Sequence, residues 1–241
     1  MLNKDITKDI SKASEPVHFD TVVRKTALQN DIRLHDELIK EVNSLGYHIQ
    51  YFWQLHGMEL CDREVYPIIR KYIGQFKEER WNIDLITCLS VPKMYEATEY
   101  LLDLYRNDTL KEPSNIGPLS VRWGCANALY RIKDPRYQKE YRELINIPGM
   151  WDGGWLMIEL LGKFKTEDNY EFILSHVNNP IMAIRSSAVT ALGGFKSHAK
   201  QLIPLLEGII SSDETQGIKE AAKNSRKKLV RFGEKHPEVL V

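Results

Sequence analysis

The stretch IRSSAVTAL (residues 184–192) repeats the pattern of VRWGCANAL (residues 121–129), and these two stretches decide the fold. Both carry apolar or small residues at relative positions 0, 4, 7 and 8. The residues are Ile184, Ala188, Ala191 and Leu192 in one stretch and Val121, Cys125, Ala128 and Leu129 in the other. At about 100° per residue these positions share one face of an α-helix, and the small residues allow a neighbouring helix to come close. The sequence therefore predicts two equivalent helices that pack through this face.

Weaker copies of the pattern begin at Ile83, Gly153 and Ile218. Successive copies are then 38, 32, 31 and 34 residues apart, which is the period of a stacked helical repeat. Further apolar stripes lie between the copies, over residues 62–76, 93–106, 136–147, 167–178 and 199–211. Because short connections rich in proline and glycine separate these segments, we predict antiparallel helix pairs. Upstream of the copies, residues 21–57 are long enough for two more helices.

The string NPIMAIRSSAVTALG (residues 179–193) resembles the HEAT-like repeat of phycobilin-lyase-type proteins. The resemblance covers roughly residues 60–230, is strongest at 179–193 and 118–132, and departs at 151–162, where Gly153-Gly154 replaces an apolar-arginine pair. It implies an all-α fold, namely a right-handed α-solenoid of about five to six HEAT-like helix pairs of the armadillo-like kind. It also implies that the second helix of each pair lines the concave surface. The family contains scaffolds and adaptors together with a few enzymes.

We expect a single domain over residues 1–241, with a flexible segment at 1–20, N-terminal capping helices at 21–60 and repeats at 60–232. Hydrophobic residues make up 43% of the chain, which is enough to bury a sizeable core. The 33 acidic and 33 basic residues cancel, so the chain as a whole has no attraction to nucleic acid or to an anionic membrane. Neither is therefore expected as a partner.

The cysteines Cys61, Cys88 and Cys125 are odd in number and widely spaced, which suits neither a disulfide framework nor a CxxC zinc site. The opening MLNKDITKDISKASEP contains acids and lysines where a secretory signal needs an apolar stretch. No window approaches about 18 apolar residues, the length of a membrane span. We expect a cytoplasmic protein, and its compactness and resemblance suggest a bacterial one.

Relative positions 2, 6 and 9 of each copy lie opposite the packing face, where polar residues should meet solvent. The two middle copies differ, with Trp123, Asn127 and Tyr130 in one and Trp155 and Glu159 in the next. By the resemblance, the two tryptophans would lie side by side in the concave groove, about 8–10 Å apart. We predict that these five residues form a binding site for a partner, because aromatic pairs with polar neighbours are typical of recognition sites.

The alternative for both tryptophans is burial in the core, under the N-terminal helices or the 107–118 loop. We expect Arg122 and Arg185 to be structural and to bridge to an acid in the adjoining repeat. The aromatic segment 47–57 either packs a capping helix, which we favour, or extends the aromatic surface. The basic run RKKLVRFGEKH (residues 226–236) is expected to be a solvated outer face of the terminal capping helix rather than a contact for nucleic acid or an acidic partner.

The sequence contains no Gly-rich phosphate loop, GxSxG elbow, HExxH or CxxC pair. His56 and Glu59 have a spacing that can ligate a metal on a helix, but Gly57 weakens the helix and no second pair follows. Nothing near Cys61 in the sequence supplies the base that a nucleophile needs. We therefore predict no catalytic residue, no metal site and no cofactor.

Two enzyme classes remain as alternatives. MWDGGW (residues 150–155) superficially resembles the site of a HEAT-like alkylpurine DNA glycosylase, but Trp155 stands four residues after Trp151, where an aspartate is expected. The repeat resemblance alone also allows a bilin lyase or isomerase that holds a flat chromophore. The function we favour is a non-enzymatic, monomeric adaptor or inhibitor-type protein that holds a segment of a protein partner in its concave groove.

Overall fold

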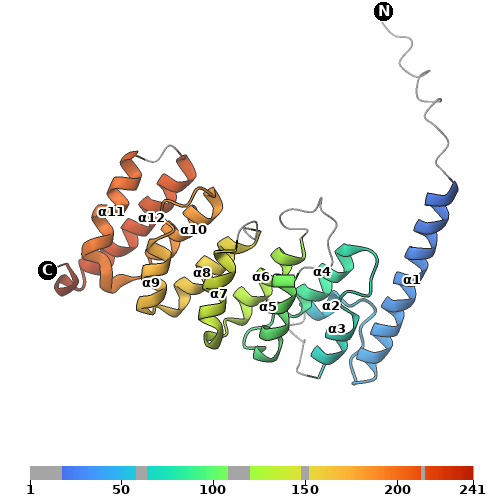
Figure 1. Ribbon diagram of the computed structural model, residues 1–241. Coiled ribbons are helices and arrows are strands. Elements are labelled where there is room, and N and C mark those ends of the chain that lie inside the picture. Colours follow the sequence, from blue (N-terminus) through green and yellow to red (C-terminus); the bar gives the residue numbers. More distant parts are fainter. Residues whose placement is uncertain (1–17, 58–63, 108–119, 148–151, 213–214, 241) are drawn as a thin grey trace, which may run out of the picture.

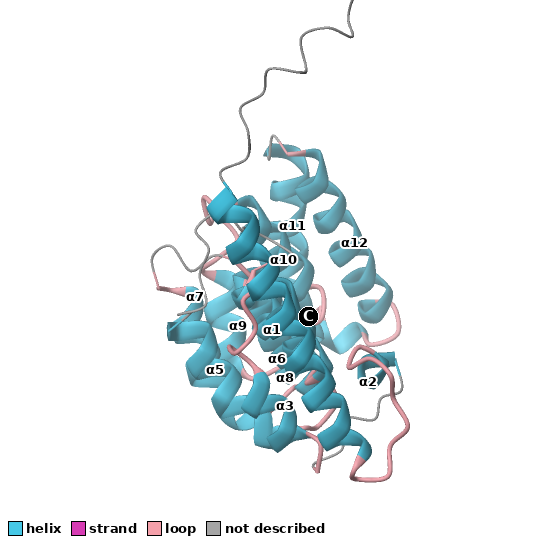
Figure 2. Cartoon of the chain, turned by 90° about the vertical axis from the view of Figure 1, so that its right-hand side faces the viewer, coloured by secondary structure: helices cyan, strands magenta, loops and turns pink. Residues whose placement is uncertain are grey.

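The structure, a computed structural model, describes residues 18–57, 64–107, 120–147, 152–212 and 215–240. Within these ranges every regular element is a helix and none is a strand (Figure 2). The helices follow one another along an elongated molecule, from α1 at one end to α11 and α12 at the other (Figure 1). The prediction of an all-α fold is therefore confirmed.

Five helices pack one against the next and form what we call the central row. They are α4 (Glu79–Cys88), α6 (Val121–Ile132), α8 (Gly154–Phe164), α10 (Met182–Leu192) and α12 (Gln216–Gly233). Each copy of the repeated pattern begins within one of these helices or, at Gly153, one residue before it, and the copy from Ile83 extends three residues past the end of α4. The periodic pattern in the sequence therefore marks the helices that contact their neighbours along the row.

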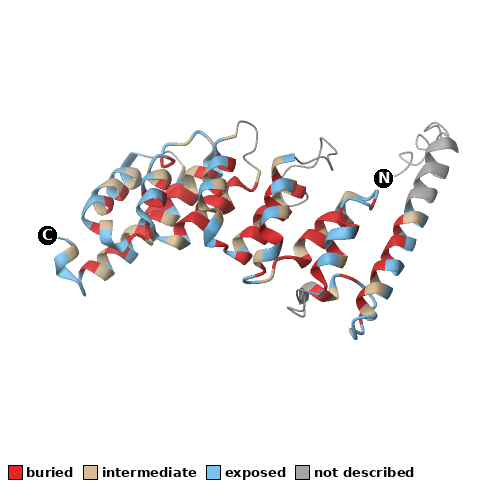
Figure 3. Cartoon of the chain, turned by 60° about the horizontal axis from the view of Figure 1, so that its bottom comes forward, coloured by how far each residue is buried: buried red, intermediate tan, exposed pale blue. Residues whose placement is uncertain are grey.

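The packing face predicted for α6 and α10 is the buried face of these helices. Of its eight residues, all are buried except Ala191, which is partly buried. Buried residues occupy one side of the helices and exposed residues the other (Figure 3). Because full burial of a Val, Leu or Ile side chain contributes about 1.5–3 kcal/mol, this face is a main source of stability for the row.

Each central-row helix also packs against one or two helices of a second set, the flanking helices. These are α3 (Tyr66–Tyr72), α5 (Thr98–Asn107), α7 (Gln138–Ile145), α9 (Glu167–Leu174) and α11 (Ala199–Ser212). All of them lie in or beside the segments predicted as partner helices. Short 3₁₀ turns at Tyr95–Ala97 and Pro135–Tyr137 precede α5 and α7, so these two helices begin later than predicted.

Two glycines set how closely neighbouring central-row helices approach. Gly153 precedes α8 with a φ of 80°, and a Cβ on it would lie 2.7 Å from the Cβ of Ala126 in α6. Gly193 follows α10, and a Cβ on it would lie 2.6 Å from the Oγ of Ser225 in α12. Real side chains do not make contacts this short, so only glycine fits without a shift of the helices. The departure of Gly153 from the repeat pattern thus has a packing reason.

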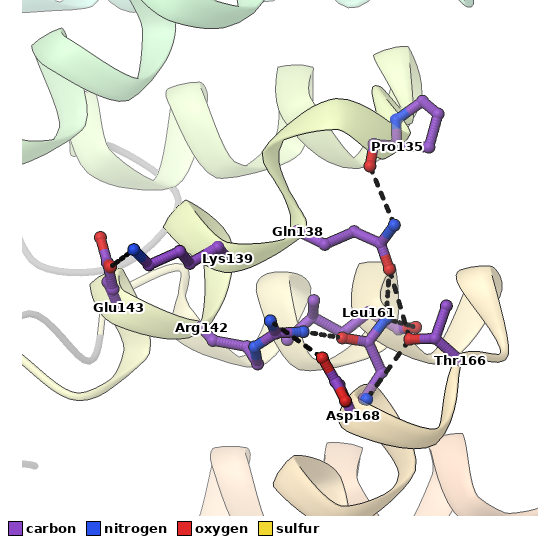
Figure 4. A network of polar contacts seen from close by, with 9 residues as sticks. Pro135, Gln138, Lys139, Arg142, Glu143, Leu161, Thr166 and Asp168 are labelled. Atoms are coloured by element: carbon purple, nitrogen blue, oxygen red, sulfur yellow. Dashed lines mark hydrogen bonds and ion pairs between the residues drawn. The ribbon is translucent and has the colours of Figure 1, made fainter.

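A network of hydrogen bonds joins two successive helix pairs (Figure 4). At its centre lies the fully buried side chain of Asn169 in α9. Its amide nitrogen donates to Gln138 Oε1 in α7 at 2.7 Å and to the Leu161 carbonyl in α8 at 3.3 Å, and its oxygen accepts from Arg142 in α7 at 2.6 Å. Because an unsatisfied buried amide costs about 1–3 kcal/mol, these partners hold α9 in place against α7 and α8.

The N-terminal end contains two helices, as the length of residues 21–57 allows, but the two are very unequal in length. α1 (His18–Asn43) is one helix of 26 residues, and α2 (Gln54–Gly57) is a single turn of four. Residues 18–20 therefore belong to a helix and not to the segment expected to be flexible. None of the described helices, α1 included, combines the length and the apolar character needed to cross a membrane.

A buried carboxylate joins α1 to the rest of the molecule. Asp31 in α1 is 2% exposed and accepts hydrogen bonds from the backbone N–H groups of Lys77 and Glu78, both at 3.0 Å. These two residues lie just before α4, where backbone N–H groups have no partner within the helix. Asp31 thus supplies from another helix the acceptor that a capping side chain would otherwise provide.

Candidate functional site

The first turns of α6 and α8 position the residues predicted to bind a partner. α6 begins at Val121 because Ser120 caps it, its Oγ accepting a hydrogen bond from the N–H of Trp123 at 3.0 Å. α8 begins directly after Gly153, which rests on the α6 backbone at Trp123. The start of α8, and with it Trp155, is therefore fixed beside the start of α6.

All five predicted site residues, namely Trp123, Asn127, Tyr130, Trp155 and Glu159, are partly buried. The two tryptophan side chains pack against the core but are not enclosed by it. Each ring is therefore neither sealed in the interior nor fully exposed, and the binding role and the core role both stay predictions. The loop that was considered as their cover lies, from residue 108 onward, outside the described residues.

Trp155 and Glu159 line an apolar hollow of about 400 Å³ together with residues of α10 and of the start of α12. Its walls include Met182 and Ser186 from α10 and Ile218 from α12. Met182 is 58% exposed, so it contributes accessible apolar surface to the wall of the hollow. The hollow therefore offers an indole and a thioether to an apolar group, with one carboxylate beside them.

The other three predicted residues, all on α6, are not among the described residues that line this apolar hollow. Tyr130 has two cations near its ring instead. The Nζ atoms of Lys133 and Lys163 lie 5.9 and 5.8 Å from its centroid, within the range of a cation–π interaction. Trp155 and Glu159 thus line one hollow, whereas Tyr130 lies near two positively charged side chains.

A larger, basic hollow of about 820 Å³ lies between the C-terminal end of α10 and α12. Among the described residues that line it none is acidic, and the basic ones are Lys196, Lys227, Lys228, Arg231 and Lys235. Most of them belong to the 226–236 run, which was expected to be only a solvated outer face. Their exposure agrees with a solvated face, and in addition they lie near the end of α10, because Gly193 brings this end close to α12.

A third hollow, of about 150 Å³, connects the other two. It shares Glu159 with the apolar hollow and Lys228 with the basic hollow. Lys163 and Lys165, at the end of α8, line it as well. The three hollows therefore form one continuous surface over α8, α10 and α12, which we call the α8–α12 groove.

Lys165 lies close to several other positively charged side chains in this groove. Its Nζ lies 4.5 Å from the centroid of the Phe195 ring. Partial burial, together with the charges of Lys163, Lys196 and Lys228, lowers the pKa of Lys165 to about 8. Because neighbouring lysines disfavour a further positive charge, an anion bound here would relieve their mutual repulsion.

A recurring lysine was missed in the sequence and would have located the basic end of the groove. One lysine follows shortly after each central-row helix, at Lys93, Lys133, Lys165, Lys196 and Lys235. The first three have positive φ values, of 67°, 56° and 55°. A cation at a helix C-terminus is favoured by the helix dipole, which gives the recurrence a structural reason too. Lys227 and Lys228 lie in the middle of α12, so the helix dipole does not explain why these two positions are lysines.

The two repeat arginines have structural roles, as the pattern predicted. Arg122 Nε donates to the Tyr105 carbonyl at 3.2 Å, and an Arg185 guanidinium nitrogen donates to the Asn179 carbonyl at 2.7 Å. Both arginines thus hold a backbone segment that precedes their own helix. The bridge to an acid of the adjoining repeat stays a prediction.

The N-terminal aromatic segment divides between core and surface. Phe52 is 1% exposed and packs inside, whereas Tyr51 and Trp53 are 45% and 52% exposed. The rings of Tyr51 and Trp53 stack on each other with centroids 4.4 Å apart. The segment does pack in part against the N-terminal helix α1, because the His35 ring lies 5.9 Å from the Tyr51 ring and 5.7 Å from the Phe52 ring. The side chain of His56 lies outside the described part of the chain.

The described residues contain no group of three or more His, Cys, Asp or Glu side chains that could hold a metal ion. Glu59, Cys61 and residues 150–151 of MWDGGW lie outside the described ranges. Asp152, the acid of that segment, accepts a hydrogen bond from the hydroxyl of Ser120. Its carboxylate therefore helps to join the start of α8 to the N-cap of α6.

The chemistry of the α8–α12 groove suits binding, because an apolar hollow, a single carboxylate and a basic hollow follow one another along it. Comparison with models of known protein families finds no match for this sequence, and comparison with curated proteins finds no significant match either.

Proposed function

We propose that this protein is a non-enzymatic binding protein, an adaptor or an inhibitor, which holds a segment of a partner protein on the concave face of a HEAT-like α-solenoid. The alternation of flanking and central-row helices supports a right-handed solenoid of about five to six helix pairs. In such a fold the second helix of each pair lines the concave face. The central row would supply these helices, and the α8–α12 groove would lie on that face.

The observation that carries the proposal is the apolar hollow formed by Trp155 and Met182. An aromatic ring in a partly desolvated hollow is the usual anchor of a protein–protein interface, where a few such residues supply most of the binding free energy. Both residues belong to regular helices, so the hollow exists before the partner arrives. A preformed hollow lowers the cost of ordering side chains on binding.

The extent of the groove favours a polypeptide segment over a small molecule. Three packed helices with axes about 8–10 Å apart span roughly 20 Å. An extended chain covers that distance in about six residues, since each residue spans about 3.3 Å. A compact small ligand would fill one hollow and leave the rest of the groove in water.

The test is a pull-down with the full chain, read by mass spectrometry, of wild type and a Trp123→Ala/Trp155→Ala variant. We expect a partner that is retained by wild type and weakened by about 30-fold in the variant, which corresponds to about 2 kcal/mol. A Tyr51→Ala/Trp53→Ala variant is the matched control, because it also removes two partly exposed aromatic rings. Equal retention by all three proteins contradicts the proposal, and so does a variant that loses thermal stability while it keeps its partner.

A further inference from the structure

We infer that the segment held in the α8–α12 groove is acidic: carboxylates of an extended peptide enter the basic hollow between α10 and α12, while an apolar side chain occupies the hollow at Trp155. This inference rests on the proposed function and specifies the chemistry of the partner.

The first argument is local charge. The chain carries no net charge, yet the described lining of the basic hollow contains five lysine or arginine residues and no acid. Lys163 and Lys165 extend this charge along the groove toward α8. Like charges gathered in one concave region repel one another and attract an anion. The anion then binds to the hollow more tightly and associates with it faster. An occupant that brings several negative charges complements this surface.

The second argument is the order of the hollows, which favours a peptide over a nucleic acid. A nucleic acid carries a phosphate at every nucleotide, so its charge is uniform along the strand. Along the groove, the basic hollow is followed by the connecting hollow, which contains Glu159, and then by the apolar hollow of Trp155 and Met182. A phosphate at Glu159 would be repelled. A peptide can present acids at one end, a neutral residue at Glu159 and an apolar side chain at Trp155.

The third argument is spacing. The lysines that follow α8, α10 and α12, namely Lys165, Lys196 and Lys235, are each carried by a successive central-row helix. Neighbouring helix axes are about 8–10 Å apart, and an extended peptide rises about 3.3 Å per residue. Acids three positions apart can therefore meet lysines of neighbouring helices. These lysines follow the C-terminal ends of the helices, whereas Trp155 and Met182 lie in the first turns, roughly 15 Å away along the helix axis, so about four neutral residues separate the acids from the apolar side chain. The inference thus includes a sequence pattern for the partner, with an apolar residue at one end.

The experiment uses fluorescence anisotropy with the full chain and a labelled 15-residue peptide. The peptide carries a Leu-Phe pair at one end, then four neutral residues, and then Glu at every third position. The peptide is made with the pair at either terminus, because the direction of binding is open. A peptide with Lys in place of Glu and a 15-nucleotide oligo-dT strand are the comparison probes. The variant Lys196→Glu/Lys228→Glu reverses charge in the basic hollow. Lys139→Glu/Lys223→Glu makes the same charge change at two exposed lysines outside it.

We expect the acidic peptide to bind at least about 10-fold more tightly than the lysine peptide, and to weaken as salt is added. The Lys196→Glu/Lys228→Glu variant should weaken it at least about 10-fold, and the Lys139→Glu/Lys223→Glu variant less than about 2-fold. Circular dichroism melts check that both variants fold.

Three results would overturn the inference. The first is equal binding of the acidic and the lysine peptide, or no binding of either at about 1 mM. The second is tighter binding of oligo-dT that is lost on charge reversal at Lys196 and Lys228, which would make the hollow a nucleic-acid site. The third is acidic-peptide binding that is lost in Trp155→Ala but kept in Lys196→Glu/Lys228→Glu. In that case the proposed function stands and only the acidic character of the partner is rejected. If peptide binding is instead lost only in Lys196→Glu/Lys228→Glu and kept in Trp155→Ala, the role of Trp155 as the anchor is rejected.

Discussion

The two ends of the molecule fill their interiors in different ways. Around α1 and α4, large rings pack together, with the Phe76 and Trp81 centroids 5.3 Å apart and the Phe52 and Trp81 centroids 5.8 Å apart. Around α8, α10 and α12, glycines let the helix ends approach at Gly153 and Gly193. The comparison teaches that close contact through small residues gives neighbouring helices a fixed spacing. Hollows can then form between the larger side chains on the exposed face.

The largest effect is expected where a glycine at each end is changed to alanine. Gly153 and Gly46 both have positive φ, of 80° and 95°, but a Cβ would clash with Ala126 only at Gly153, and Gly46 has open space around it. Gly153→Ala should lower the free energy of unfolding by about 3 kcal/mol, since strain and a steric clash add. Gly46→Ala should lower it by about 1 kcal/mol. Urea denaturation measures both, and equal losses would show that the close contact with α6 is unimportant.

A second comparison concerns two buried asparagines. Asn169 bonds to the preceding helix pair, whereas Asn82 in α4 bonds to the Gly74 N–H and the Phe76 carbonyl, both nearby in the chain. Replacing either by alanine should cost about 2 kcal/mol, because buried polar partners lose a hydrogen bond. Hydrogen exchange should accelerate across α7, α8 and α9 in Asn169→Ala but only around α3 and α4 in Asn82→Ala. The same exchange pattern in both variants would contradict a joining role for Asn169.

A third comparison tests exposed apolar residues at the two ends. Met182→Ser should weaken the captured partner by about 1 kcal/mol, or about 5-fold, because the thioether no longer contributes apolar area to the contact. Leu45→Ser, a change at an exposed leucine just after α1, should leave the affinity unchanged. Titration calorimetry with the purified partner measures the difference. Equal affinities of the partner for the two variants would show that the apolar hollow is not part of the interface.

The smallest effect is expected from the charge of Lys165. Its folded-state pKa of about 8 lies below the ordinary lysine value, so between about pH 8 and 10.5 the unfolded chain binds a proton that the folded chain has released. The Lys165 contribution to the free energy of unfolding should therefore rise with pH over this window. The other groups that face it are Lys163, Lys196 and Lys228, with Glu159 as the described acid in the connecting hollow.

Lys165→Gln should accordingly stabilise the protein below pH 8, by less than about 1 kcal/mol because much of the side chain is exposed. The matched control is Lys93→Gln, which removes a lysine from the corresponding place after α4. Thermal melts at pH 7 and pH 9.5 measure the effect. A destabilised Lys165→Gln variant at pH 7 would mean that the side chain is held by attraction and not by repulsion.

The helices of the central row could be read from the sequence because their contact faces repeat. Val121 and Ile184 begin the same stripe in two helices, and burial of that stripe is imposed by the contact with the next helix. The long α1 could not be read in this way. It packs on the rest of the molecule through Leu34, Leu38 and Val42, which do not follow the repeated pattern. It is also joined by Asp31, whose partners lie more than forty positions away.

The candidate site could be read only in part. Trp155 stood out because it breaks the polar pattern of its face, and Glu159 was predicted beside it on the same face; the structure brings both into one hollow. Met182 was missed because its exposure depends on where α10 begins relative to α8 and α12, which no local pattern encodes. The basic run of α12 was recognised, but its convergence with Lys196 depends on the close approach at Gly193.

The contacts along the central row also have a mechanical consequence. Each of its helices contacts the helix before and the helix after it in the row, as well as its flanking helices. A slight tilt at every joint then adds up to a change in curvature over the whole length. A bound partner that lies across α8, α10 and α12 would contact three helices at once. It would restrict their motion relative to one another and so stiffen this half of the molecule.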